Sequence, residues 1–196
     1  MKIGINARLL TKPFTGIGQY TRNLLAELAR QDKETEYVLV VPEEIPQKLA
    51  REFPKNVEIK VLKEKRIPGA GLRKTWWEQI TVPEFFMKVG VNLAFFTYPC
   101  NPWTQDWYKK GRAAGRGPKT VVTVHDCIPW MNKNYRKGIL SKLYHSQTRK
   151  AVAKADLILT VSGSSKADIE KVCGVNPAKI EVVYNDASPI YKEEPH

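Results

Sequence analysis

Short apolar runs alternate along this chain with segments in which apolar residues recur every three or four positions. The runs are rich in Val, Ile, Leu and Phe and are bounded by turn residues, which is typical of β-strands. We expect strands at residues 2–6, 37–41, 57–62, 93–96, 120–125, 157–161 and 180–183. Most of these runs are nearly continuous rather than alternating, which indicates strands that are buried on both faces.

Helical periodicity fills most of the intervals between the strands. We expect helices at residues 17–30, 47–53, 74–89, 135–154 and 164–172. The third must bend or break near Pro83, because proline lacks the N–H that an interior turn needs. Ser162 or Ser164 is expected to cap the last helix.

This alternation of strands and helices predicts an α/β fold, a Rossmann-like doubly wound parallel sheet with helices on both faces. A length of 196 residues with 42% apolar residues fits one large domain with a packed core. The sequence contains no internal repeat.

The chain carries a formal net charge of +12, which is unevenly distributed. Between Tyr108 and Lys150 stand eleven Lys and Arg residues and one acid, Asp126, so this segment carries +10 and the rest +2. Part of it is a basic, low-complexity stretch at 109–119, expected to be a surface loop. Such a patch indicates an anionic partner, a nucleic acid, a lipid surface or a phosphorylated substrate, unless it is only a solvated face. Nucleic acid is the weakest of these, because aromatic residues do not interleave with the basic ones.

The helix expected at 135–154 is basic and amphipathic. Its apolar stripe consists of Ile139, Leu140, Leu143, Tyr144 and Ala151. Either this stripe packs against the sheet with the charges in water, or the helix lies on an anionic membrane through Lys137, Lys142 and Arg149. Both alternatives stay open from the sequence.

Nothing in the chain resembles a secretory signal or a membrane span, because Lys88 and Asn92 interrupt its best apolar stretch. The three cysteines lack CxxC spacing, which argues against a disulfide framework and against a zinc site. We expect reduced, buried thiols at Cys100, Cys127 and Cys173. A cytoplasmic protein is therefore expected, and the basic segment leaves open a peripheral position at the inner face of the membrane.

A glycine loop follows the first strand and opens the first helix. Gly16, Ile17 and Gly18 stand where the N–H groups of a helix start are free and where the missing Cβ atoms let a ligand approach. This predicts a phosphate site. The loop departs from a dinucleotide fingerprint, because Thr21 replaces the third glycine and the first lies far from the strand, which argues against a nicotinamide cofactor. A tight turn that requires positive φ is the structural alternative.

A His-Asp pair, His125 and Asp126, follows the fifth expected strand. The carboxyl ends of strands are where open α/β sheets bind ligands. Neighbouring residues at a strand end point in different directions, so we expect only one of the two to face any single ligand atom. Zinc is improbable, because His145 and His196 share no metal-ligand spacing with His125.

Two further loops carry candidate contacts for a sugar or an acceptor. Tyr98, Asn101 and Trp103 follow the fourth strand, and Ser162 and Ser165 follow the sixth. The face of Trp103 suits a sugar or a lipid, but equally suits a loop anchored on the core. The two serines either donate to sugar hydroxyls or cap the following helix, and capping is favoured.

Several stretches, in order from residue 3 to residue 185, resemble the N-terminal half of retaining GT-B glycosyltransferases of family 4. The resembling stretches are Ile3-Gly4-Ile5-Asn6-Ala7-Arg8, residues 16–25, Trp77-Glu78-Gln79, residues 123–129, residues 155–162, Ser165-Lys166 and residues 179–185. The tail departs from the family, because Asn185-Asp186-Ala187 stands where Asn-Gly-Val-Asp is common.

The resemblance implies two Rossmann-like domains facing each other across a cleft, of which residues 1–185 form the N-terminal, acceptor-side one. Residues 186–196 would begin the interdomain linker or a tail, and the nucleotide-binding C-terminal domain would lie outside this chain. The paired glutamates and the phosphate-clamping Arg and Lys of the family have no counterpart here.

The resemblance also implies roles for individual residues. The loop of Gly16, Ile17 and Gly18 would approach the diphosphate of a nucleotide-sugar donor, His125 would contact the transferred sugar, and Asp126 would contact a sugar or lipid-linked acceptor. Such enzymes retain anomeric configuration by a front-face substitution, with no protein nucleophile, no metal and no cofactor besides the donor.

Two hypotheses of different classes follow. The first is the acceptor-side domain of a glycosyltransferase of the hexosyltransferase type, inactive without a donor-binding domain or subunit. The second is a non-catalytic basic Rossmann-like module that binds an anionic lipid, glycan or nucleic acid.

Overall fold

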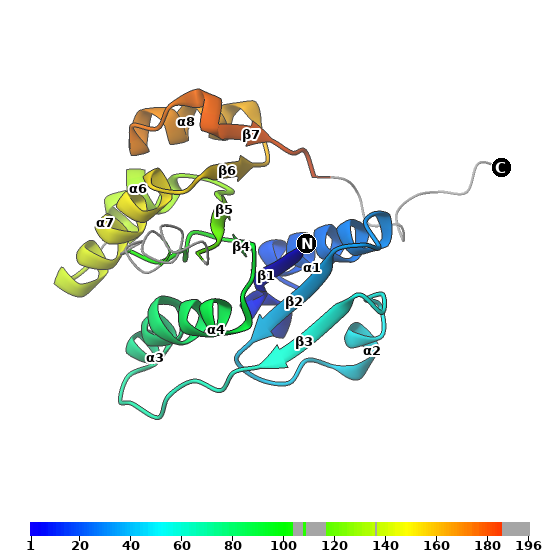
Figure 1. Ribbon diagram of the computed structural model, residues 1–196. Coiled ribbons are helices and arrows are strands. Elements are labelled where there is room, and N and C mark those ends of the chain that lie inside the picture. Colours follow the sequence, from blue (N-terminus) through cyan, green and yellow to red (C-terminus); the bar gives the residue numbers. More distant parts are fainter. Residues whose placement is uncertain (104–107, 109–116, 136, 186–196) are drawn as a thin grey trace.

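The computed structural model describes residues 1–103, 108, 117–135 and 137–185 (Figure 1). The basic loop expected at 109–119 lies largely outside these residues, and the linker or tail expected at 186–196 lies wholly outside them.

Within the described residues, seven strands form one parallel sheet in the order β3-β2-β1-β4-β5-β6-β7. The strands are β1 Lys2–Asn6, β2 Glu36–Val41, β3 Val57–Val61, β4 Leu93–Phe96, β5 Lys119–Thr123, β6 Leu157–Thr160 and β7 Ile180–Val182. Every predicted strand is present, with ends that differ by at most two residues. The predicted Rossmann-like α/β fold is confirmed.

The described residues form the α-helices α1 Gly16–Gln31, α2 Gln47–Ala50, α3 Ala70–Trp76, α4 Val82–Val89, α6 Ile128–Met131, α7 Ile139–Ala153 and α8 Gly163–Cys173. Short 3-10 turns occur at Arg8–Thr11, Lys133–Tyr135 and Pro177–Lys179. The sequence did not indicate α6, which has four residues and so too little length to show a period.

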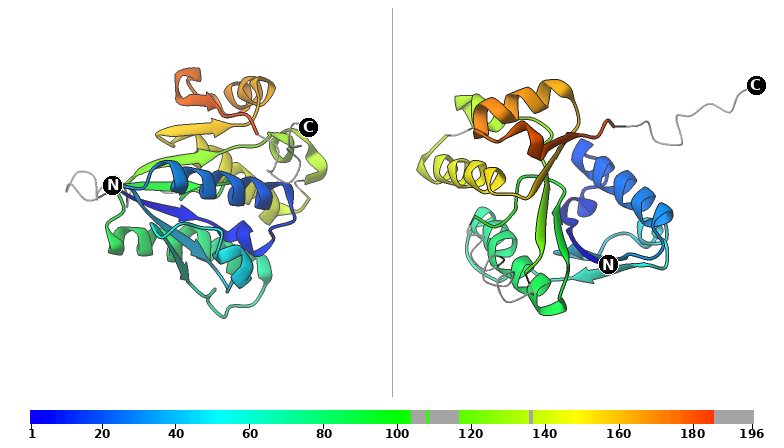
Figure 2. Two further views of the ribbon diagram at one scale, coloured as in Figure 1. Left: turned by 90° about the vertical axis from the view of Figure 1, so that its right-hand side faces the viewer. Right: turned by 45° about the horizontal axis from the view of Figure 1, so that its top comes forward.

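Helices cover both faces of the sheet, as Figure 2 shows with α1 on one side and α4 and α7 on the other. Neighbouring residues of β2 divide between two cores: Leu39 packs with Leu25 of α1, and Val40 packs in the cluster of Phe86 of α4 and Val152 of α7. This two-sided burial explains the continuous apolar runs of the strands.

Near Pro83, where the sequence predicts a bend or a break, the chain stays helical but its α-helical geometry is interrupted. Residues 70–89 are helical throughout, but the five residues before α4, Trp77–Thr81, form a π-helix. Pro83 then stands in the first turn of α4, where a backbone N–H would lack a partner within that helix. The chain accommodates the proline by widening the helix.

The helix expected at 135–154 begins later, at Ile139. Gly138 precedes it with φ 81° and ψ 159°, a conformation essentially restricted to glycine. Tyr135 ends a separate 3-10 turn. The predicted stripe divides: Ala151 is buried, whereas Ile139, Leu140 and Leu143 are exposed, so packing of the whole stripe against the sheet is excluded.

The order of the strands reverses between β1 and β4. From these adjacent strands the chain proceeds outward in opposite directions, to β2 and β3 on one side and to β5, β6 and β7 on the other (Figure 1). The loops at the carboxyl ends of two such strands diverge and leave a crevice, which is where open α/β sheets bind ligands.

Candidate functional site

A cavity of about 210 Å³ lies at the carboxyl edge of the sheet. Its lining comes from α1, α3, the loops after β4 and β5, α6 and α7. The lining residues are Ile17, Lys74, Tyr98, Pro99, His125, Asp126, Pro129, Trp130, Tyr144, His145 and Thr148. The cavity is mostly apolar, with a few polar and charged groups that converge on it, as ligand sites commonly are.

His125 is held from two sides. Its Nε2 lies 3.0 Å from the carbonyl oxygen of Thr97, and the ring of Tyr20 meets its ring edge to face with 4.6 Å between centroids. The Tyr20 hydroxyl lies 3.0 Å from Thr123 Oγ1 at the end of β5. With Nε2 donating to Thr97, Nδ1 is left as the acceptor of the ring.

Burial lowers the pKa of His125, although the Thr97 carbonyl and the charge of Asp126 oppose this effect. The neutral imidazole is therefore favoured at neutral pH. Such a ring can accept a hydrogen bond from a ligand hydroxyl without bringing a positive charge into the cavity.

Asp126 is exposed, and its Oδ1 accepts a hydrogen bond of 2.8 Å from the backbone N–H of Ile128. The carboxylate thereby fixes the turn that leads into α6. Both His125 and Asp126 line the cavity. Their polar atoms have different partners within the protein, the Thr97 carbonyl for His125 and the Ile128 N–H for Asp126.

The start of α1 leaves two amides for a ligand. Thr15 is the N-cap, and its Oγ1 accepts from the N–H of Gly18, while its own N–H donates to the Lys12 carbonyl. The N–H groups of Gly16 and Ile17 have no partner within a helix at these positions. The positive end of the α1 dipole therefore presents these two amides beside the cavity.

The two glycines of this loop differ in what they require. A Cβ on Gly18 would collide with the carbonyl oxygen of Lys12, whereas a Cβ on Gly16 would meet nothing within 4 Å. Neither has a positive φ, so the alternative of a left-handed turn is wrong. The absence of a Cβ at Gly18 lets the Lys12 carbonyl pack closely against the start of α1. The absence of one at Gly16 leaves open space in front of the helix.

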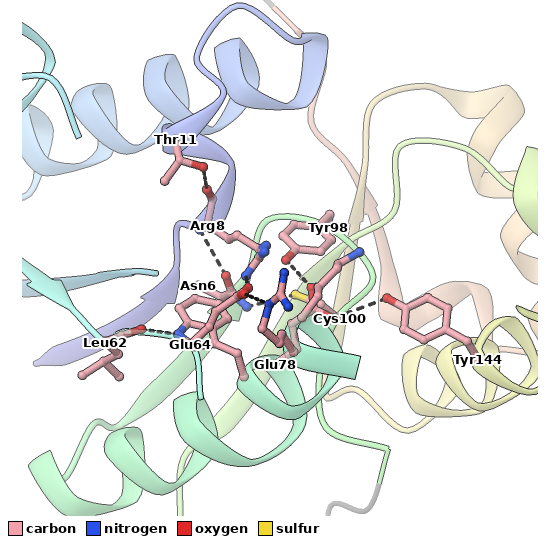
Figure 3. A network of polar contacts seen from close by, with 12 residues as sticks. Asn6, Arg8, Thr11, Leu62, Glu64, Glu78, Tyr98, Cys100 and Tyr144 are labelled. Atoms are coloured by element: carbon pink, nitrogen blue, oxygen red, sulfur yellow. Dashed lines mark hydrogen bonds and ion pairs between the residues drawn. The ribbon is translucent and has the colours of Figure 1, made fainter. Parts of the chain in front are cut away.

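Two of the lining residues, Tyr98 and Tyr144, contact the buried carboxylate of Glu78, which is labelled with them in Figure 3. Glu78 Oε1 accepts a hydrogen bond of 2.5 Å from the Tyr98 hydroxyl, and Oε2 accepts one of 3.4 Å from the Tyr144 hydroxyl. Lys74 Nζ lies 3.7 Å from Glu78 Oε1 and over the faces of both tyrosine rings. One carboxylate thus holds three residues of the lining.

Complete burial raises the pKa of Glu78 above its ordinary value, and this effect exceeds the opposing effects of Lys74 and the tyrosine hydroxyls. Burial also raises the pKa of Tyr98 and of Tyr144, so both hydroxyls keep their protons. Relative to a carboxyl in water, burial thus shifts Glu78 toward its protonated form.

The cluster around Glu78 continues toward β1. The Arg8 guanidinium pairs with Glu64 at 2.5 Å and lies over the Trp77 ring, whose indole N–H donates to the Leu62 carbonyl (Figure 3). Asn6, the last residue of β1, donates from Nδ2 to Cys100 Sγ at 3.2 Å. These contacts tie the loops after β1, β3 and β4 to the helix that carries Glu78.

The sequence profile of Glycosyltransferase Family 4 matches residues 14–185 of this chain. The chain belongs to that family. No curated protein sequence matches it.

Solved structures of other proteins share the fold of this family 4 domain. The apo form of the lipopolysaccharide outer core galactosyltransferase WaaB matches with a TM-score of 0.60 and 14% identity, over 96% of this chain and 46% of that protein. A UGT transferase from Siraitia grosvenorii in complex with UDP matches with a TM-score of 0.55 and 10% identity, over 93% and 50%. A UDP-N-acetylglucosamine 2-epimerase matches with a TM-score of 0.55 and 13% identity, over 92% and 47%.

The chain spans about half the length of these solved structures. At such identities the likeness shows the fold, and together with the family match it confirms the resemblance to the N-terminal domain of GT-B glycosyltransferases. The epimerase match shows that this fold is not confined to transferases.

The family 4 domain brings only some of the predicted site residues together. Ile17, Tyr98, His125 and Asp126 line the same cavity, with Gly16 beside Ile17 at the start of α1. Tyr98 does so as a donor to Glu78, with a buried ring. The contacts of these residues with a donor or an acceptor stay predictions.

Asn101 and Trp103 follow Tyr98 in the loop after β4 and do not line the described cavity. Asn101 is fully buried and donates from Nδ2 to the Ala151 carbonyl at 2.8 Å. The Trp103 backbone N–H donates to Gln79 Oε1 at 2.8 Å, and its ring meets the Tyr144 ring edge to face. Both anchor the loop in this conformation, and a contact with a sugar or acceptor stays a prediction for each.

The serines after β6 make contacts within the protein. Ser162 is the N-cap of α8, since its Oγ accepts from the Ser165 N–H at 3.1 Å, as the favoured interpretation predicts. Ser165 Oγ donates to the His125 carbonyl at 2.9 Å. Neither residue lines the described cavity. They hold the loop of His125, and a role toward a sugar hydroxyl stays a prediction.

Tyr20, Lys74 and Glu78 are parts of the site that sequence reasoning did not assign to it. The signal for Glu78 was present, because a carboxylate within the apolar run Trp76-Trp77-Glu78-Gln79-Ile80 has to be buried with partners. The apolar stripe predicted for residues 135–154 includes Tyr144, whereas its hydroxyl donates a hydrogen bond to Glu78.

The three cysteines are free thiols, as expected; Cys100 and Cys127 are buried as predicted, whereas Cys173 is only half-buried. Burial raises the pKa of Cys127 to about 12 and that of Cys173 to about 11, and it raises that of Cys100 strongly. All three are therefore poor nucleophiles at neutral pH.

The described part of the chain lacks a metal-binding cluster and a membrane-spanning helix. No three His, Cys, Asp or Glu side chains lie together in a way that could hold a metal ion there. None of the helices in that part combines the length and the apolar character needed to cross a bilayer.

Proposed function

We propose that this chain is the acceptor-side domain of a retaining glycosyltransferase of the hexosyltransferase type. The enzyme would transfer a sugar from a nucleotide-sugar donor to a sugar or lipid-linked acceptor. A second, donor-binding domain or subunit would complete the active site.

The observation that carries this proposal is that the start of α1 and the His125-Asp126 pair meet around one cavity. The amides of Gly16 and Ile17 suit an anion, which we assign to the donor diphosphate. Membership of family 4 supports a sugar-transfer reaction, and the UDP bound to the Siraitia grosvenorii structure supports a nucleotide-linked donor.

We assign His125 to the transferred sugar and Asp126 to the acceptor. Because His125 Nε2 is engaged with Thr97, Nδ1 would accept a hydrogen bond from a sugar hydroxyl. The exposed carboxylate of Asp126, which lines the same cavity, would orient an acceptor hydroxyl.

In the proposed reaction the bond between the anomeric carbon and the donor phosphate breaks, and the acceptor oxygen bonds to the same face of that carbon. The departing phosphate takes the acceptor proton, so no protein nucleophile, metal or cofactor is proposed. Stabilising the phosphate charge is the main electrostatic task, to which the two α1 amides would contribute. The donor-binding domain would supply the remainder.

We expect residues 1–196 alone to show no measurable transfer, because one wall of the cleft would be absent. Joining them to the donor-binding half of the protein should give turnover with at least one member of a panel of nucleotide sugars. NMR of the product would show a retained anomeric configuration. Robust transfer by residues 1–196 alone would contradict the requirement for a second domain, and an inverted product would contradict the retaining mechanism.

The competing hypothesis is a non-catalytic basic module that binds an anionic lipid, glycan or nucleic acid. No transfer from any nucleotide sugar by the joined protein, together with tight and salt-sensitive binding of one of these anions, would favour it. We propose a cytoplasmic location at the inner face of the membrane.

A further inference from the structure

Six large apolar side chains are exposed on α6, the following 3-10 turn and the first half of α7. We call this surface the α6–α7 patch. Its residues are Ile128, Met131, Tyr135, Ile139, Leu140 and Leu143. Ile139 and Leu140 are the most exposed, at 83% and 72%.

Such exposure needs an explanation, because contiguous apolar side chains on a soluble surface usually mark an interaction site. The helices themselves are well anchored, since Trp130 of α6 and Ala151 and Val152 of α7 are buried. The patch is therefore the outer side of packed helices and not a segment that has failed to fold.

The surroundings of the patch carry positive charge without a compensating acid. Between Asp126 and Asp156 the sequence holds seven Lys and Arg residues and no Asp or Glu. Lys133, Lys137 and Lys142 are exposed and stand within two positions of patch residues in the sequence. Apolar side chains bordered by lysines complement a surface that is anionic outside and apolar inside.

We propose that the α6–α7 patch inserts into the interface of an anionic lipid bilayer. Ile139, Leu140 and Leu143 would enter the boundary between headgroups and acyl chains, while Tyr135 would lie at headgroup level. Lys133, Lys137 and Lys142 would contact the lipid phosphates. An apolar protein partner would leave these lysines without counter-charges, and a purely ionic ligand would leave the leucines in water.

The opposite end of α7 belongs to a different surface. Arg149, Lys150 and Lys154 line a groove with Lys171 and Gly174 of the α8 end, and Arg149 donates to the Val172 carbonyl at 3.3 Å. Arg149, which the sequence suggested for a membrane contact, is thus engaged with α8. The membrane contact is confined to the first half of the helix.

The same helices carry the candidate site. On α6, Pro129 and Trp130 line the cavity between patch residues Ile128 and Met131, and on α7 the lining begins at Tyr144, next to Leu143. A bilayer against the patch would therefore lie beside the mouth of the cavity. This step rests on the proposed function: the acceptor would be a lipid-anchored hydroxyl compound presented at the bilayer surface.

Vesicle sedimentation of the 196-residue chain tests the contact without any transfer reaction. Vesicles of phosphatidylcholine with one quarter phosphatidylglycerol are compared with pure phosphatidylcholine, at low and at high salt. We expect partitioning onto the anionic vesicles that is at least tenfold stronger than onto neutral ones and that falls steeply with salt.

Three double variants separate insertion of the apolar side chains from general charge attraction. Ile139→Ser with Leu140→Ser should lower partitioning at least tenfold while leaving the net charge unchanged. Lys137→Glu with Lys142→Glu should also abolish most of it. Lys150→Glu with Lys154→Glu makes the same change of charge on the far end of α7 and should lower partitioning no more than about threefold. Circular dichroism confirms that each variant is folded.

Absence of binding to anionic vesicles would overturn the inference, as would equal binding to neutral vesicles. Equal losses in the two lysine pairs, or normal binding by the serine variant, would show that only the overall charge matters and would also overturn it. Specific vesicle binding by a protein that transfers no sugar in the panel assay would contradict the proposed function alone.

Discussion

At the scale of single residues, the arrangement around His125 shows how one ring is both placed and kept neutral. The Thr97 carbonyl, the Tyr20 ring and burial act on the same imidazole. Burial lowers its pKa, so the unfolded chain takes up a proton more readily than the folded one. The contribution of His125 to stability is therefore complete above the ordinary histidine pKa and is lost as the pH falls below it.

We predict that His125→Ala destabilises the domain by about 1–3 kcal/mol, because a hydrogen bond and an aromatic contact are lost. In the joined two-domain protein it should also lower turnover of the folded fraction roughly 100-fold, if the ring contacts the transferred sugar. Asn56→Ala is the control. It removes hydrogen bonds to the carbonyls of Ala29, Asp32 and Thr35 away from the cavity. It should lower stability and leave turnover of the folded fraction unchanged; the same pattern for His125→Ala would make His125 purely structural.

At the scale of elements, the start of α1 combines a structural and a proposed binding requirement in neighbouring glycines. The Thr15 cap and the close Lys12 carbonyl demand a residue without Cβ at Gly18, whereas Gly16 has open space around its Cα. The glycine pattern of the sequence alone did not separate the two.

We predict that Gly16→Val keeps the fold and weakens donor binding at least tenfold, because the side chain would occupy the space in front of the α1 amides. Gly18→Ala should instead lower the free energy of unfolding by about 1–3 kcal/mol, since the loop has to move away from the new Cβ. Gly71→Val, in α3 and likewise without contacts for its Cβ, controls for the change in helix propensity. Calorimetric titration of the joined protein with its donor measures the effect of Gly16→Val, and thermal unfolding measures that of Gly18→Ala. Unchanged donor affinity in Gly16→Val would show that the loop does not bind the donor phosphate.

At the scale of the whole molecule, the Glu78 cluster joins parts of the chain that are distant in sequence. Its carboxylate receives hydroxyls from the loop after β4 and from α7, and the neighbouring Arg8 and Trp77 contacts extend the cluster to the ends of β1 and β3. The shape of the cavity wall therefore depends on one buried acid.

We predict that Glu78→Gln becomes more stable relative to the wild type as the pH rises from about 4 to 8. Because burial raises the Glu78 pKa, the folded state holds its proton more tightly than the unfolded chain. This stabilisation is present below the ordinary carboxyl pKa and is lost as the pH rises through the raised pKa. The glutamine variant has no such loss. Thermal unfolding across this pH range measures the difference in Tm, with exposed Glu44→Gln as the control for charge. A Tm of Glu78→Gln that falls relative to the wild type as the pH rises would show that Lys74 and the tyrosines outweigh burial.

The seven strands and their parallel arrangement could be predicted because burial on both faces leaves a continuous apolar run that needs no knowledge of neighbours. The α1 loop, the His125-Asp126 pair and the family resemblance could likewise be identified from short stretches of sequence. The place of Glu78 in the site could not be predicted from local sequence, since its partners Tyr98 and Tyr144 lie 20 and 66 positions away along the chain. The role of Gly138 could not be predicted either, because only its backbone conformation explains why α7 begins at Ile139.

Local patterns in the sequence predict the order of the elements, the parallel sheet and the chemical groups at its carboxyl edge, because each depends on residues close together in the chain. Which groups share the cavity, and which side of α7 faces outward, depends on packing between elements that are distant in sequence. A periodic apolar stripe has the same pattern whether it packs inward or meets a bilayer. The packing of α7 against its neighbours buries Ala151 and Val152 and leaves Ile139, Leu140 and Leu143 exposed, so the first half of the stripe does not pack inward.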